Sequence, residues 1–265
     1  MWKKIRVFVL LLVLITVVQD QWRDSIDKNW KKSIYVALYP INADGSVAAE
    51  KTIQALKQDN FLESQNYLAE QSKRYGVGLY HPFELRLGQT VKSLPPLPPK
   101  PAGLLNTVIW SLKFRWWAWF NSPNQLKTGE KMVKPDVRLY LLFNDPATHT
   151  VLGHSTALSK GRVGLVNLFA TADYLSQDQV VMTHELLHTF DATDKYSFAD
   201  NMPMFPSGFA EPDKLPLFPQ IQAELMAGRV PVSESKAIIP KDLSFTIIGT
   251  KTAQEIGWLK SHNNE

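Results

Sequence analysis

The hydrophobic pattern along residues 33–265 switches repeatedly between strand-like and helix-like periods. Short runs rich in β-branched and aromatic residues predict strands at 33–41, 83–91, 136–143 and 162–169. Apolar positions at helical spacing predict helices at 48–57, 61–74 and 104–120, and a further helix from near Ser176 or Asp178 to about Phe190. Strands and helices interleaved in this way predict an α+β domain whose sheet packs on that last helix.

The helix expected at 104–120 is apolar around nearly its whole circumference. It carries four of the chain's eight tryptophans, and Lys113 and Arg115 are its charged residues. Burial in the core explains such a helix, and so does a surface that rests on a membrane interface, where tryptophan and basic residues are favoured. Before it, the proline-rich run at 94–101 predicts an extended internal spacer.

The first residues have the pattern of an export signal. Lys3, Lys4 and Arg6 precede an apolar run at 7–18. The residues that follow hold no small-x-small cleavage site, which favours an uncleaved anchor with its basic end in the cytoplasm over a cleaved signal peptide. We therefore expect an N-terminal signal-anchor helix at 1–19, a juxtamembrane stalk at 20–32 and one domain at 33–265.

Composition excludes several classes of function. The chain has no cysteine, which rules out disulfides, thiolate metal sites and a catalytic thiol. Its formal net charge is +4, yet three of the 29 basic residues are Lys3, Lys4 and Arg6, which leaves 26 against 25 acidic residues in the rest of the chain. With so little excess positive charge, nucleic acid is not an expected partner.

The strongest chemical signal is the string His184-Glu185-Leu186-Leu187-His188. Residues four apart lie on one face of a helix, so both imidazoles can bind one cation while Glu185 lies beside it as a general base. This pattern predicts a catalytic Zn²⁺ site, in which zinc activates a water molecule for hydrolysis. Catalytic zinc normally has three protein ligands, so a third donor is required.

Two carboxylates compete for the third ligand position. Asp194 follows the helix closely enough for the chain to turn back to the metal, whereas Glu224 lies on a later segment. Asp191 is a poorer candidate because it lies seven residues beyond His184, about 10.5 Å further along a continuous helix axis. We expect Asp191 to hydrogen-bond one of the histidines instead.

The extended string from His184 to Asp194 resembles the metzincin metallopeptidases, whose pattern is H-E-x-x-H-x-x-G-x-x-H/D followed by a methionine-containing turn. The resemblance implies that His184, His188 and Asp194 are the zinc ligands and that a mixed sheet packs on the motif helix. Asp191 stands where that family has glycine. The helix must then end at an aspartate with positive φ, which aspartate tolerates at some strain.

Residues outside the motif extend this hypothesis. Met226 is the candidate for the methionine turn, ahead of Met202 and Met204, and a core methionine is the competing interpretation. Tyr196, two residues past Asp194, is a candidate hydrogen-bond donor to the oxyanion, and a loop anchor is the alternative. The stretch at 154–158 is where metzincins present an edge strand to substrate, so peptide pairing is conceivable there.

The motif continued to Tyr196, together with residues 39–45, is similar to a family of uncharacterised bacterial membrane-anchored proteins. That similarity implies a single-pass protein of the bacterial inner membrane whose domain faces the periplasm or exterior. We expect a membrane-anchored zinc metallopeptidase that hydrolyses peptide bonds in a protein or peptide substrate. The alternatives are a non-catalytic envelope protein with a structural or partner-binding metal, and a zinc amidase that acts on cell-wall material.

Overall fold

A five-stranded mixed sheet forms the centre of the domain. The computed structural model describes residue 6 and residues 22–100, 103–123, 126–128, 131–171, 173 and 175–260. Four strands run parallel, in the order β2 (Phe83–Leu87), β1 (Ile34–Asn42), β5 (Val137–Asn144) and β7 (Val163–Phe169). The short strand β6 (Thr156–Leu158) pairs antiparallel with β7 at the edge. The prediction of an α+β fold with a mixed sheet is therefore confirmed.

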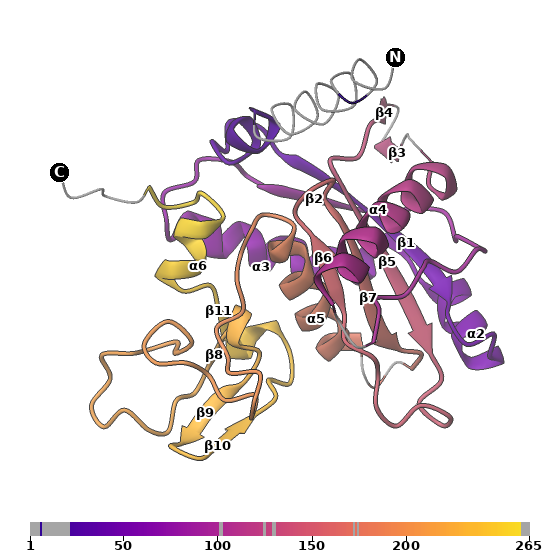
Figure 1. The fold of residues 1–265 in the computed structure, drawn as a ribbon. Coiled ribbons are helices and arrows are strands. Elements are labelled where there is room, and N and C mark those ends of the chain that lie inside the picture. The colour runs from indigo at the N-terminus through magenta and orange to yellow at the C-terminus, as the bar shows by residue number, and fades with distance from the viewer. Residues whose placement is uncertain are drawn as a thin grey trace.

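Helices cover both faces of the sheet (Figure 1). One face carries α2 (Val47–Ala55), α3 (Leu62–Lys73) and α5 (Leu175–His188), and the other carries α4 (Leu104–Asn121). Successive residues of a strand point to opposite faces, so Val36 and Leu38 of β1 enter the larger core with α5, whereas Ala37 and Tyr39 pack toward α4. The two helices that concern function here, α4 and α5, thus lie on opposite sides of the sheet.

The C-terminal third consists of short elements that follow α5. They comprise paired strands β8 (Ala223–Glu224) and β11 (Thr246–Ile247), a hairpin of β9 (Val230–Ser233) and β10 (Lys236–Ile238), the 3₁₀ turns η3 (Leu225–Ala227) and η4 (Leu243–Phe245), and helix α6 (Thr250–Glu255). Elsewhere, η1 (Gln58–Phe61) precedes α3, and a hairpin of β3 (Leu126–Thr128) and β4 (Lys131–Val133) follows α4. Both η3 and η4 contact α5. The sequence pattern did not predict these elements because each is too short to show a period.

The segment expected to be a stalk is folded into the domain. Residues 22–27 are helical, and the Trp30 side chain is only 7% exposed. Its indole packs against three buried aromatic rings, those of Phe83, Phe190 and Trp258. The domain boundary expected at residue 32 therefore lies too late, because burial of a large aromatic side chain stabilises this segment on the core.

The predicted helices and strands agree with the structure to within a few residues, apart from two ends. Helix α5 begins at Leu175, so Ser176 and Asp178 lie inside its first turn and neither is the cap. Strand β2 ends at Leu87, four residues earlier than expected. Within the described ranges, no helix is both long enough and apolar enough to cross a membrane. The anchor expected at 1–19 lies outside the described residues, Arg6 excepted.

Candidate metal centre

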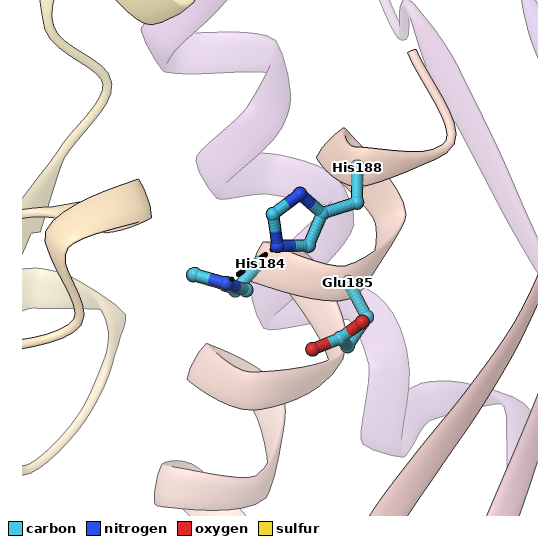
Figure 2. Close-up of side chains that lie close together, drawn as sticks. All are labelled: His184, Glu185 and His188. Carbon is cyan, nitrogen blue, oxygen red and sulfur yellow. Dashed lines mark hydrogen bonds between the residues drawn. The ribbon is translucent and has the colours of Figure 1, made fainter. Parts of the chain in front are cut away.

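Helix α5 holds the two histidines on the face turned away from the core. Leu186 and Leu187 are fully buried in the main core, while the side chains of His184 and His188 keep 14% and 19% exposure. Figure 2 shows their imidazoles together, one helical turn apart, with the Glu185 carboxylate beside them. The i, i+4 spacing gives this arrangement because 3.6 residues complete a helical turn.

Three potential ligand atoms converge beside α5. The Nε2 atoms of His184 and His188 lie 2.9 Å apart, and Asp194 Oδ1 lies 3.2 Å from each. Zinc bonded to nitrogen and oxygen at about 2.0–2.1 Å in a tetrahedron separates its ligands by about 3.3 Å. The triangle of donors therefore has the size of one face of such a tetrahedron.

Backbone carbonyls fix which ring nitrogen of each histidine faces this point. Nδ1 of His184 lies 3.0 Å from the Leu225 carbonyl oxygen, and Nδ1 of His188 lies 2.7 Å from that of Ala192. A carbonyl only accepts, so each neutral ring carries its hydrogen on Nδ1 and leaves a lone pair on Nε2. Two lone pairs and a carboxylate oxygen that face each other repel one another unless a cation lies between them. This donor set fits Zn²⁺, and the carbonyls act as the orienting partners that ligand histidines commonly have.

Electrostatics around the pair also favour a cation. Burial lowers the pKa of His184, but the Asp194 and Glu185 carboxylates and the Leu225 carbonyl outweigh burial and raise that pKa overall. Burial likewise raises the pKa of Asp194, yet hydrogen bonds and attraction from the two imidazoles in their protonated form bring it far below its ordinary value. While the rings are neutral, Asp194 Oδ1 is buried and accepts no hydrogen bond, which makes it a polar atom without a partner of its own beside the two imidazoles.

The chain returns Asp194 to the helix through the turn at Asp191. Asp191 has φ +65°, which confirms the positive φ expected where the metzincin pattern has glycine. The amide of Ala192 then donates to the Leu187 carbonyl and closes the helix end. The expected bond from Asp191 to a histidine is absent: its carboxylate accepts from Lys28 Nζ at 2.7 Å, and His188 is oriented by the Ala192 carbonyl instead.

Glu224 is fully engaged elsewhere. One of its oxygens accepts from the amides of Met226 and Ala227, and the other accepts from the Gly249 amide and the Thr252 hydroxyl. Its side chain is 0% exposed and caps the η3 turn. Of the two carboxylates that competed for the third position, the structure brings Asp194 to the histidines and commits Glu224 to the fold.

The turn that contains Met226 supports the site from beneath through its backbone. The Leu225 carbonyl accepts from His184, and the Met226 carbonyl accepts from the Lys195 amide, next to Asp194. Met226 itself is fully buried in the main core, whereas Met204 is 44% exposed. The two interpretations of Met226, as turn residue and as core residue, are thus compatible.

Glu185 is a buried carboxylate without a hydrogen bond on one oxygen. It is 5% exposed, its Oε2 has no partner, and its ligand oxygen lies within 4.8 Å of both histidine nitrogens. Burial raises the pKa of Glu185, and the two histidines partly oppose that rise. A second carboxylate, that of Asp194, lies 3.2 Å from both imidazoles, so two carboxylates face this pair of histidines.

Tyr196 lies half-buried next to this group. Burial, followed by the charges of Asp194 and Glu185, raises the pKa of Tyr196 to about 12, so its hydroxyl carries a proton at neutral pH. His154 is exposed in the loop before β6, where the Asn167 side chain donates to its carbonyl. The edge strand expected near His154 is present as β6.

The sequence matches no known family model and no curated protein at a significant level. The metzincin resemblance therefore rests on the motif at 184–194 alone. Sequence reasoning missed the two carbonyl partners, at Leu225 and Ala192, because any residue type supplies a carbonyl and no pattern marks one.

Proposed function

We propose that the protein is a zinc-dependent metallopeptidase, with His184, His188 and Asp194 as the metal ligands. The observation that carries the proposal is the convergence of two imidazole nitrogens and a carboxylate oxygen at mutual distances of 2.9–3.2 Å, beside a buried carboxylate. Three protein ligands and partly exposed side chains are typical of a catalytic zinc site, whereas structural zinc is enclosed by four protein ligands.

Each residue has a role that follows from its place. When bound, zinc would polarise a water molecule and the carbonyl of the scissile bond. Glu185 would accept the proton from that water and pass it to the leaving amine, a role favoured by its burial and raised pKa. Tyr196, protonated at neutral pH, would donate a hydrogen bond to the oxygen on which negative charge develops.

The edge of the sheet supports a peptide as the substrate. Strand β6 pairs with β7 on one side only, so its outer backbone groups are available to an extended chain. Helix α5 contacts β6, which puts this edge next to the metal-binding helix. Backbone pairing there would align a substrate with the site whatever its side chains. The basic and apolar N-terminal segment supports a location at the bacterial inner membrane with this domain outside the cytoplasm.

The test compares zinc content and hydrolysis in the wild type and in Glu185→Gln. We expect one zinc per chain in both proteins, cleavage of a mixed peptide library by the wild type, and loss of cleavage by at least 100-fold in the variant. The amide keeps the size of the side chain but does not accept the proton. Zinc without cleavage of peptides in the wild type would point to the non-catalytic alternative, and cleavage of cell-wall fragments only would point to the amidase.

A further inference from the structure

Helix α4 turns an apolar face to solvent. Its inner side is buried, through Trp110, Phe114 and Ala118. Its outer side, which we call the α4 outer face, consists of eight large apolar residues that are each 42–87% exposed: Leu104, Leu105, Val108, Ile109, Leu112, Trp116, Trp119 and Phe120. Burial in the core therefore accounts for only one side of this helix.

The α4 outer face is larger than the apolar patches of ordinary soluble proteins. Trp116, Trp119 and Phe120 are 60–64% exposed. Aromatic side chains of about 150–250 Å² then leave roughly 300–450 Å² in contact with solvent. That area alone approaches the largest patch of a typical monomer, about 300–600 Å², and five aliphatic side chains extend it. A surface of this size is typical of a site that contacts a protein, a membrane or a ligand.

The charges of the helix indicate which of these the α4 outer face contacts. Helix α4 contains no acidic residue, and its two charged residues, Lys113 and Arg115, are both basic. Tryptophan at the boundary between apolar and polar phases, aliphatic residues beside it and basic side chains at the flanks are the composition of helices that lie in the surface of a phospholipid bilayer. A protein partner would not require this absence of negative charge.

The position of α4 supports the same occupant. The Arg115 stem packs against Gly161, where an added Cβ would lie 2.9 Å from Arg115 Cδ. The next residue, Arg162, pairs with Asp24 at 2.8 Å. Asp24 follows the apolar run at 7–18 by only six residues, and Trp22 between them is 70% exposed. The helix therefore lies beside the place where the chain leaves its apolar N-terminal segment.

We propose that the α4 outer face rests in the interface of a phospholipid membrane, as a second contact besides the N-terminal segment. Because α4 and α5 cover opposite faces of the sheet, this contact turns the metal-binding helix away from the lipid and toward the aqueous phase. This orientation of the domain on the membrane does not depend on whether the metal site on α5 is catalytic. It would allow α5 to meet a soluble or peripheral polypeptide more readily than one embedded in the bilayer.

The absence of cysteine allows a direct test with single labels. Leu112→Cys and Trp116→Cys each carry an environment-sensitive fluorophore on the α4 outer face. The matched control is Val47→Cys on α2, which is 69% exposed and lies on the opposite side of the sheet. The full chain is reconstituted into vesicles of mixed zwitterionic and anionic phospholipids, with a quencher on the lipid acyl chains. We expect blue-shifted, quenched emission at both α4 positions and water-like, unquenched emission at Val47.

A second variant separates lipid contact from other causes. Leu112→Asp combined with Trp119→Asp in the chain labelled at position 116 should abolish quenching with zinc content unchanged, because these side chains lie outside the core. Water-like emission at both α4 positions in the parent chains overturns the proposal, and so does equal quenching at Val47. A blue shift at the α4 positions that grows with protein concentration and is not accompanied by quenching from the lipid also overturns it, because a second copy of the chain would then cover this face.

Discussion

Two carboxylates, those of Asp194 and Glu224, should give opposite results when they are changed. Asp194→Ala removes an atom that lies 3.2 Å from both histidine nitrogens, whereas Glu224→Gln alters a side chain that holds the η3 turn. We expect the first change to abolish tight zinc binding with a smaller loss of stability in the metal-free protein than the second. The second should leave zinc binding intact in the folded protein and lower its free energy of unfolding.

The magnitudes follow from the contacts. The Asp194 side chain is 21% exposed, and the imidazoles that lower its pKa also stabilise the folded state, so its removal should cost about 1–2 kcal/mol in the metal-free protein. Loss of a residue that hydrogen-bonds to a metal ligand typically weakens metal binding by roughly 10–100-fold, so loss of a ligand itself should weaken zinc binding by more than that. Glu224 accepts four hydrogen bonds at 0% exposure, and a glutamine there loses one or two of them. At about 1.5–3 kcal/mol for each bond to a charged group, Glu224→Gln should cost roughly 2–6 kcal/mol.

The assay pairs urea unfolding of the metal-free proteins with zinc titration of the folded fraction. Stability is read from the midpoint, and affinity from competition with a chelator. Wild-type zinc affinity in Asp194→Ala would refute the assignment of the third ligand. Loss of zinc from folded Glu224→Gln, with stability unchanged, would instead make Glu224 the ligand and contradict the hydrogen-bond network described above.

Three further changes test other parts of the molecule. Trp30→Ala should lower the free energy of unfolding in urea by about 3–5 kcal/mol, because it leaves a cavity among buried aromatic rings. The control Trp22→Ala, at a 70% exposed position, should lower it by less than about 0.5 kcal/mol. Equal effects would contradict the placement of Trp30 in the core. Burial raises the pKa of Asp178 from 3.8 to about 7, so the folded protein keeps this proton longer than the unfolded chain and loses stability as the pH rises from about 4 to 7. Asp178→Asn should therefore stabilise the protein at pH 8 by up to roughly 4 kcal/mol and have little effect near pH 4, and a gain independent of pH would argue against this origin. Tyr196→Phe should lower turnover with zinc retained, and unchanged turnover would show that the hydroxyl does not act on the oxyanion.

Local patterns predicted most of the central fold. Strands β1, β5 and β7 and helices α2 to α5 arise from apolar spacing within each segment, which neighbours in sequence largely determine. The C-terminal elements escaped prediction because strands of two to four residues are too short to show a period, and β8 is held by pairing with β11, which follows more than twenty residues later. The misplaced boundary at residue 32 has a similar origin. Trp30 is buried by the rings of Phe190 and Trp258, which are far away in the sequence, so the residues around Trp30 do not predict these contacts.

The sequence by itself determined that His184, Glu185 and His188 share one helix, because residues four apart meet on a helix in any tertiary context. The metzincin resemblance added the expectation of a positive φ at Asp191, which the structure has. Tertiary structure alone decided that Asp194 rather than Glu224 joins the histidines, and that the Leu225 carbonyl, 41 residues from His184, orients the imidazole. It alone decided which side of α4 is buried. These outcomes depend on where separate segments pack, and side-chain spacing along one segment carries no information about that.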